Sequence, residues 1–177
     1  MKLQKQNTLT ITLFIVYILL LTGIILFKLP FYSGKISDGI RVINLIPLQG
    51  SFDENDVILL REIIYNILLF IPLGIYIRML KSEWPFKKKV LPVIALSLSF
   101  EVIQLIFAMG RTDVTDILGN TLGGIIGIGM GAILFKIFKN RTVKIMNIFA
   151  LAVTVCMVLR FVQLFYLSHF VMRALYR

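Results

Sequence analysis

Five long apolar runs, separated by short polar connections, constrain this chain more than any other feature. They cover about residues 9–29, 63–80, 90–109, 113–138 and 145–170. A helix needs about 20 apolar residues to cross the hydrocarbon core of a bilayer. Because these runs leave no room for a soluble domain beyond the loops, we predict an all-α integral membrane bundle. It has about five transmembrane helices and forms one membrane domain over residues 1–177.

The charge distribution fits a membrane protein better than a nucleic-acid-binding one. Hydrophobic residues make up 58% of the chain and charged residues 16%, and the charges lie mostly between the apolar runs. A net charge of +10 would suggest nucleic acid in a soluble protein. Here the basic residues flank apolar segments, as topology signals and contacts to anionic head groups do. We therefore predict membrane lipids as partners and no nucleic acid.

Lysine and arginine counts beside the runs predict the orientation. The N-terminus, the second-to-third connection and the fourth-to-fifth connection carry two, five and four of them. The first loop, the third-to-fourth hinge and the C-terminus carry four, one and two. The more basic side is expected to be cytoplasmic. We therefore predict a multi-pass protein of the cell membrane with its N-terminus in the cytoplasm and its C-terminus outside.

The third and fourth runs are joined by a hinge of four residues, from Gly110 to Asp113, which predicts a tight turn and an antiparallel helical hairpin. Glu101 and Gln104 are three residues apart in the third run and share one helix face. An ionisable residue in a lipid-buried helix is costly and usually faces a protein interior or a wet cavity. Gln104 and Arg111 are the local candidates to hold the Glu101 side chain in its ionised form.

The fourth run begins with a second set of polar residues on one face. Asp113, Asp116 and Asn120 follow one another at spacings of three and four. The two acids fall in the first helical turn, where carboxylates cap the chain and meet the positive end of the helix. Capping alone would explain these two acids. Since Glu101, Gln104 and Asn120 are expected nearby, the hairpin is also a candidate binding site.

Two further asparagines and a row of glycines have open interpretations. Asn44 precedes a proline turn in the first loop and either caps that turn or joins the site. Asn66 lies inside the second run and either links helices or joins the site. A stripe of glycines spaced by four predicts close approach of another helix, from this chain or from a second copy, so the oligomeric state stays open. The stripe consists of Gly119, Gly123, Gly127 and Gly131.

The site residues leave three functional classes open. The single histidine argues against a histidine-rich metal site, and we predict no metal ligands and no cofactor. No P-loop, nucleophile elbow or HExxH sequence is present. In an enzyme, paired carboxylates could perform acid–base chemistry on a lipid-linked substrate, or hold a divalent cation through oxygen ligands. In a binding protein, the polar groups could bind the head of an amphiphile. A proton-coupled transporter is the third class, although no internal repeat is evident.

Several ordered motifs resemble one family of small membrane proteins. They are NLIP at residues 44–47, RE at 61–62, NILLFIPLG at 66–74, LSFEVIQ at 98–104, TDVTD at 112–116 and NTLGG at 120–124. Over about residues 26–131 the chain is similar to the VanZ-like family, which is linked to teicoplanin resistance. The resemblance implies reduced susceptibility to teicoplanin-type lipoglycopeptides in a Gram-positive envelope, without remodelling of the peptidoglycan stem peptide.

The resemblance implies no established reaction, so whether the protein is an enzyme stays open. We favour an accessory resistance role in which the polar site binds an amphiphilic envelope molecule or the antibiotic at the outer face. The alternative is a membrane enzyme that uses paired carboxylates on a lipid-linked envelope precursor. The candidate binding residues are Asn44, Asn66, Glu101, Gln104, Arg111, Asp113, Asp116 and Asn120.

Overall fold

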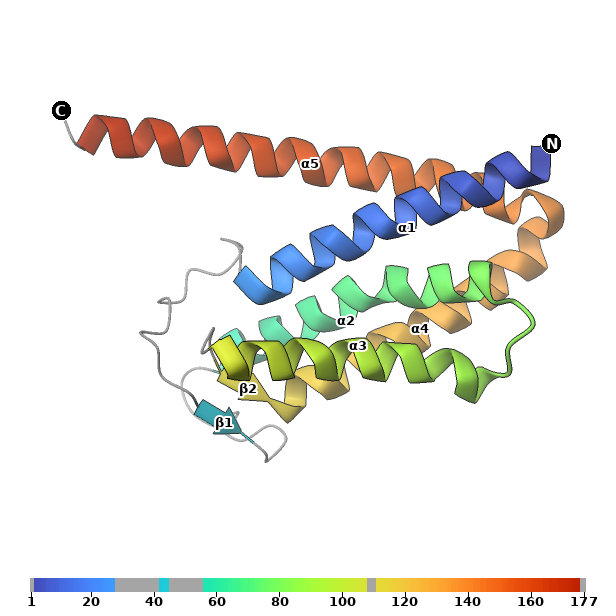
Figure 1. The fold of residues 1–177 in the computed structure, drawn as a ribbon, viewed down its shortest axis with the longest axis horizontal. Helices are drawn as coiled ribbons and strands as arrows, with labels where there is room; N and C mark the ends of the chain where they lie inside the picture. The colour runs from blue at the N-terminus through green and yellow to red at the C-terminus, as the bar shows by residue number, and fades with distance from the viewer. Residues whose placement is uncertain (1, 28–41, 45–55, 108–110, 176–177) are drawn as a thin grey trace. The chain divides into compact units, whose positions relative to one another are not determined.

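The computed structural model describes residues 2–27, 42–44, 56–107 and 111–175. Its elements are α1 (Lys2–Phe27), β1 (Val42–Asn44), α2 (Asp56–Leu80), α3 (Phe86–Phe107), β2 (Arg111–Asp113), α4 (Val114–Phe138), the 3-10 helix η1 (Lys139–Arg141) and α5 (Thr142–Leu175). Figure 1 shows the five long helices and the short β1–β2 pair. The predicted all-α membrane class is confirmed.

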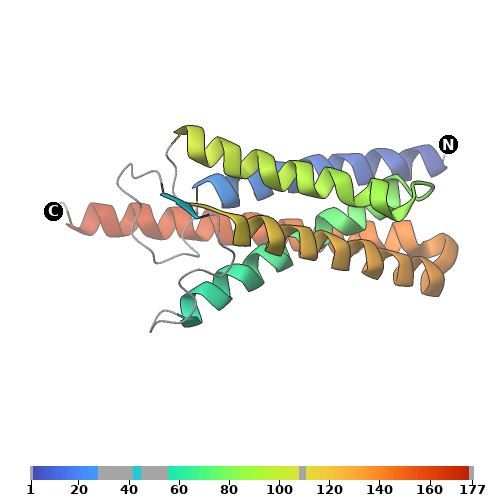
Figure 2. The same ribbon diagram turned by 90° about the horizontal axis from the view of Figure 1, so that it is seen from below.

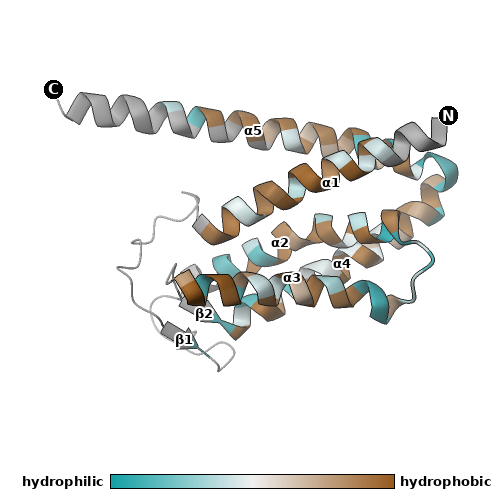
Figure 3. Ribbon diagram, in the orientation of Figure 1, coloured by the Kyte–Doolittle hydropathy of each residue, from teal (hydrophilic) through white to brown (hydrophobic). Residues whose placement is uncertain are grey.

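Hydropathy along the described residues gives four candidate membrane spans, namely Thr8–Leu26, Leu60–Leu80, Phe86–Phe107 and Val114–Cys156. The fourth candidate runs through α4 into α5, so the predicted count of about five is approximate. The brown, hydrophobic parts of the helix ribbons in Figure 3 lie along these apolar stretches. Several helices extend beyond the predicted runs, because a helix can continue through polar residues once it leaves the apolar stretch. α1 begins at Lys2 and α2 at Asp56.

The described chain divides into two compact units. One combines the segment up to Ile18 with the segment from Asn140 onward, and there Thr10 Oγ1 and Asn147 Oδ1 lie 3.1 Å apart as a buried hydrogen-bonded pair. The other, Leu19–Lys139, contains every predicted site residue. The site is therefore described within this second unit alone, and the prediction of one domain over the whole chain stays a prediction.

The glycine stripe of α4 packs against α2 of the same chain. A Cβ added at Gly123 would meet the carbonyl of Ile67, and one at Gly127 would meet the carbonyl of Ile71. Small residues let helix backbones approach this closely, which is how membrane helices associate without a hydrophobic driving force. Figure 2 shows α4 crossing α2. The stripe thus positions α4, and with it the polar residues of its first two turns.

The hinge between α3 and α4 is more than a tight turn. Arg111, Thr112 and Asp113 form β2, which pairs in parallel with β1 in the register Val42↔Arg111 and Asn44↔Asp113. Residues 108–110, which include only the first residue of the predicted turn, lie outside the described residues. An extended segment leaves backbone donors and acceptors that need partners, and here β1 of the first loop supplies them. The pairing places Asn44 beside Asp113.

The connection between α2 and α3 lies at the opposite end of this unit from β1 and β2 (Figure 1). Lys89 is buried there, and its Nζ donates to the carbonyl oxygen of Ser82 at 3.0 Å and also to the carbonyl oxygen of Trp84. Nζ atoms of Lys81 and Lys88 lie 5.3 and 5.4 Å from the centre of the Trp84 ring, within the range of cation–π attraction. These contacts hold the connection in place.

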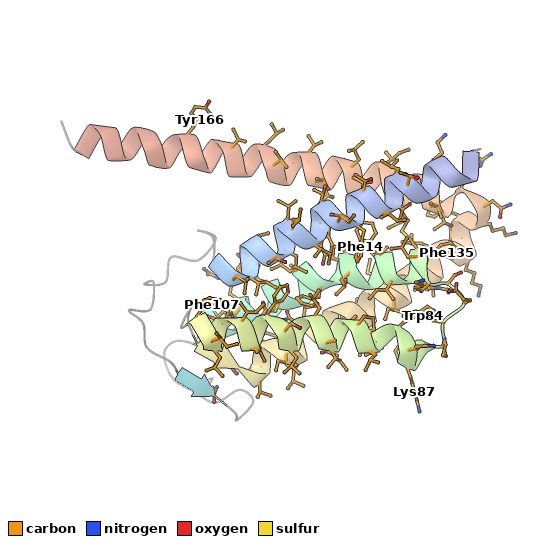
Figure 4. The ribbon with its side chains drawn as sticks, viewed as in Figure 1. Phe14, Trp84, Lys87, Phe107, Phe135 and Tyr166 are labelled. Carbon is orange, nitrogen blue, oxygen red and sulfur yellow. The ribbon has the colours of Figure 1, made fainter. Side chains whose placement is uncertain are left out.

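Replacing Lys89 with methionine is expected to lower the free energy of unfolding by about 1–3 kcal/mol, because the charged donor to two carbonyls is lost. Lys87 is the matched control, since it is exposed and Figure 4 shows its side chain pointing away from the helices. Thermal unfolding in detergent would compare the two methionine variants with wild type. Equal melting temperatures for all three would show that Lys89 contributes nothing to the connection.

Candidate functional site

The centre of the polar cluster links α3, α4 and the first loop. Glu101 is 3% exposed, and its Oε2 accepts the backbone N–H of Asp113 at 3.1 Å. The Asp113 carboxylate accepts the Thr115 N–H at 2.9 Å through Oδ1 and the Asn44 Nδ2 donor at 3.0 Å through Oδ2. Asp113 is the N-cap of α4, with φ −130° and ψ 125°. Capping and the candidate site therefore share this residue.

A second polar pair joins α2 to the first turn of α4. Asn66 Nδ2 donates to Asp116 Oδ1 at 2.6 Å, and both side chains are half-buried. Gly119 lies one turn further along α4, and a Cβ added there would lie 3.4 Å from the Cβ of Asn66. Asn66 therefore links two helices, as one of its two interpretations expected, and it also orients a carboxylate next to the cluster.

Two amides of the cluster are buried with one atom unpartnered among the described residues. Gln104 Nε2 donates to the Ile25 carbonyl at 3.0 Å, while its Oε1 has no hydrogen-bond partner. Asn120 Nδ2 donates to Ser97 Oγ at 2.9 Å, while its Oδ1 has none. Both side chains are 2% exposed. Most buried polar atoms in folded proteins are paired, so these two oxygens require an explanation.

The structure thus brings six of the eight predicted site residues into contacts among α2, α3, α4 and β1, and the seventh, Gln104, contacts the Ile25 carbonyl of α1. The eighth, Arg111, takes part in β2 through its backbone, and its side chain lies outside the described part of the chain. Its predicted role as the partner of Glu101 stays a prediction. The backbone N–H of Asp113 is the donor that the structure gives to the Glu101 carboxyl group.

Sequence reasoning missed three participants. Ser97 is fully buried and lies four residues before Glu101, so helical spacing could have placed it on the same α3 face. Thr115 contributes its backbone N–H, a group that every residue except proline would supply. Ile25 contributes a carbonyl near the end of α1, where helical carbonyls lack an intrahelical donor. Gln104 therefore also fastens the end of α1 to α3.

Chemically the cluster is a set of oxygen acceptors enclosed by apolar helices. It contains the carboxyl groups of Glu101, Asp113 and Asp116 together with two buried amide oxygens. Among the described residues no group of three or more His, Cys, Asp or Glu side chains is arranged to hold a metal ion. Such a set can hold a polar head group that donates hydrogen bonds.

The fold and the cluster define a multi-pass helical membrane protein with polar groups buried between its helices. Residues 14–138 match the model of the VanZ/LLP1 family, and the chain belongs to this family. It is 38% identical to Protein VanZ of Enterococcus faecium over 115 residues, which are 63% of this chain and 66% of the Enterococcus protein. The match therefore spans just under two thirds of that relative's length. No solved structure matches the chain.

Proposed function

We propose that this protein is a membrane accessory factor that lowers susceptibility to teicoplanin-type lipoglycopeptides, as its similarity to Protein VanZ implies. It does so by binding an amphiphilic envelope molecule, or the antibiotic itself, at the outer face of the membrane. The observation that carries the binding proposal is the buried Glu101 carboxyl group, which sits among polar side chains between apolar helices. Ionisable residues inside membrane helices usually mark functional sites.

The location of the site at the outer face rests on the distribution of basic residues. Around the connection between α2 and α3 lie Lys81 and, in the first turn of α3, Lys87, Lys88 and Lys89. Around the connection between α4 and α5 lie Lys139, Arg141 and, in the first turn of α5, Lys144. Figure 3 shows the hydrophilic α2–α3 connection at the other end of the unit from β1 and β2. If the basic end faces the cytoplasm, the β1–β2 end and its carboxyl groups face outward.

Binding is favoured over catalysis because the carboxyl groups of the cluster are engaged with protein donors. Both oxygens of Asp113 accept hydrogen bonds, one from Thr115 and one from Asn44. A general base must instead reach a proton of its substrate. The enzyme alternative is tested by Asp116→Glu, because moving a catalytic carboxylate should remove nearly all activity, whereas binding should weaken gradually.

The proposal predicts the behaviour of a sensitive Gram-positive host that expresses the protein. Wild type is expected to raise the minimal inhibitory concentration of teicoplanin more than that of vancomycin. Glu101→Gln and Asp116→Asn are expected to return teicoplanin susceptibility to that of the host, because losing a charged hydrogen-bond acceptor weakens binding about 10-fold or more. Glu83→Gln is the matched control, since Glu83 is exposed in the α2–α3 connection.

Membrane levels of every variant must be measured by quantitative immunoblot. Variants that are present at the wild-type level and no longer protect would support the site. Full protection by both site variants would show that the carboxyl groups are structural. A fall in the amount of Glu101→Gln that matches its loss of protection would equally assign Glu101 a structural role.

A further inference from the structure

We infer that the polar cluster binds the protonated amine of an amphiphile, with Gln104 Oε1 as one of its acceptors. This inference rests on the proposed function, because it names the head group that the same cluster takes. The carrying observation is that this oxygen, like Asn120 Oδ1, lies on a buried side chain and has no hydrogen-bond partner in the described chain. A buried acceptor without a donor costs free energy that a donating ligand would recover.

The orientation of the Gln104 amide is fixed by its neighbour. Its partner, the Ile25 carbonyl, is an acceptor only, so the Nε2 group must face it. The oxygen of the amide is therefore the atom left over. Gln104 follows Glu101 by three residues on the same buried face of α3, so an acidic residue shares the face that carries this oxygen.

Asn120 provides a second buried acceptor, between α4 and α3. Its side chain contacts Ser97, which lies four residues before Glu101 on the α3 face that also carries Gln104. Ser97 and Gln104 are thus separated by about two helical turns, roughly 10 Å, with Glu101 between them. Glu101, which is also buried, therefore lies between these two positions along α3.

The donor and acceptor capacity of the common head groups decides among them. A hydroxyl group brings one donor and two acceptor lone pairs, so a sugar adds acceptors to a site that already has them in excess. A phosphate is anionic and accepts strongly, so it is poorly matched to neighbouring carboxylates. An ammonium group has three donors and no acceptor. It alone supplies donors to the amide oxygens without adding another acceptor.

The carrier of this amine is an amphiphile because the outer faces of the same helices are apolar. On α3, the side chains opposite the polar row are exposed and hydrophobic. They are Leu98, Val102 and Ile106. A head group entering between α3 and its neighbours can therefore leave its alkyl chain in the lipid.

The test uses the full chain in phosphatidylcholine nanodiscs and measures its thermal unfolding with four probes of one chain length. These are dodecylammonium, dodecyltrimethylammonium, dodecyl glucoside and dodecyl phosphate. Dodecylammonium alone is expected to raise the melting temperature, by about 5 to 10 °C at about 100 times its Kd. Dodecyltrimethylammonium controls for charge and partitioning, because it is a cation without an N–H donor.

Two lysine variants make the test specific to the cluster. Gln104→Lys keeps a donor for the Ile25 carbonyl and supplies an ammonium group within the chain, so it is expected to fold and to lose the response to dodecylammonium. Asn140→Lys is the matched control, because Asn140 is an exposed amide in η1, and it should respond like wild type. Gln104→Met, which removes the acceptor without adding a charge, should also lose the response.

The inference is overturned if the trimethylated, glucoside or phosphate probe stabilises the protein as much as dodecylammonium does. It is also overturned if Gln104→Lys fails to fold or keeps the wild-type response. These results are separate from those of the susceptibility assay. If protection depends on Glu101 but dodecylammonium does not stabilise the protein, the proposed function stands and only the assignment of an amine head group is rejected. Absence of protection by wild type would remove the proposed function itself.

Discussion

Replacing Gly127 with leucine is expected to prevent α4 from packing on α2 and to remove most of the folded protein. Even a Cβ at this position would meet the backbone carbonyl of Ile71 and lie 3.1 Å from the Cα of Gly74. Overpacking into movable side chains already costs about 1–3 kcal/mol, and here the obstacle is backbone. We therefore expect a loss at or above about 3 kcal/mol, together with loss of protection in the susceptibility assay.

Gly129→Leu is the matched control for this substitution. Gly129 lies on the same helix, and a Cβ there would meet nothing within 4 Å. The fraction of monodisperse protein after detergent extraction, measured by fluorescence-detected size-exclusion chromatography, compares the two variants. A wild-type elution profile and melting temperature for Gly127→Leu would show that α2 and α4 do not approach as closely as described.

The glycine stripe shows how far sequence reasoning reaches in this fold. The spacing of four residues predicted a face of close approach, because the period of a helix brings such residues together. It could not identify the partner, since the groove accepts any helix of suitable shape. Gly74 of α2, which faces the carbonyl of Gly124, is the complementary feature.

The polar cluster was predictable to the extent that it lies within single helices. Glu101 and Gln104 share a buried face of α3, as their spacing predicted, and Asp113 caps α4 as its position predicted. The contact of Asn44 with Asp113 joins residues 69 positions apart through a pair of three-residue strands. No periodicity encodes such a pairing, because it depends on where the first loop comes back to the hinge.

The same limit applies to the unpartnered oxygens. A sequence indicates that Gln104 and Asn120 are polar residues in apolar helices, but it does not indicate which of their atoms find partners. That depends on Ile25 and Ser97, which come from α1 and α3. The inference of an amine-binding site therefore required the three-dimensional arrangement, whereas the existence of a polar site did not.

Replacing Asp113 with alanine is expected to lower the free energy of unfolding by about 2–4 kcal/mol, because it removes two interactions at once. Loss of an N-cap costs about 1 kcal/mol, and loss of the acceptor for a buried amide donor costs about 1–3 kcal/mol. The affected donors are the Thr115 N–H and Asn44 Nδ2. Thermal unfolding in nanodiscs measures the total, and amide hydrogen exchange at Ile43 and Thr112 reports whether β1 separates from β2.

Asp113→Ser divides this loss into its two parts. A serine hydroxyl still caps α4, since serine is a strong N-cap residue, but it is too short to reach Asn44 and carries no second oxygen. Its melting temperature should fall between those of wild type and Asp113→Ala, and exchange at Ile43 should be as fast as in the alanine variant. If Asp113→Ser instead matches wild type in both measurements, the Asn44 bond contributes nothing and strand pairing alone holds the first loop. Asn44 would then have no part in the site, whereas Glu101, which contacts the backbone of residue 113 rather than its side chain, would keep its place.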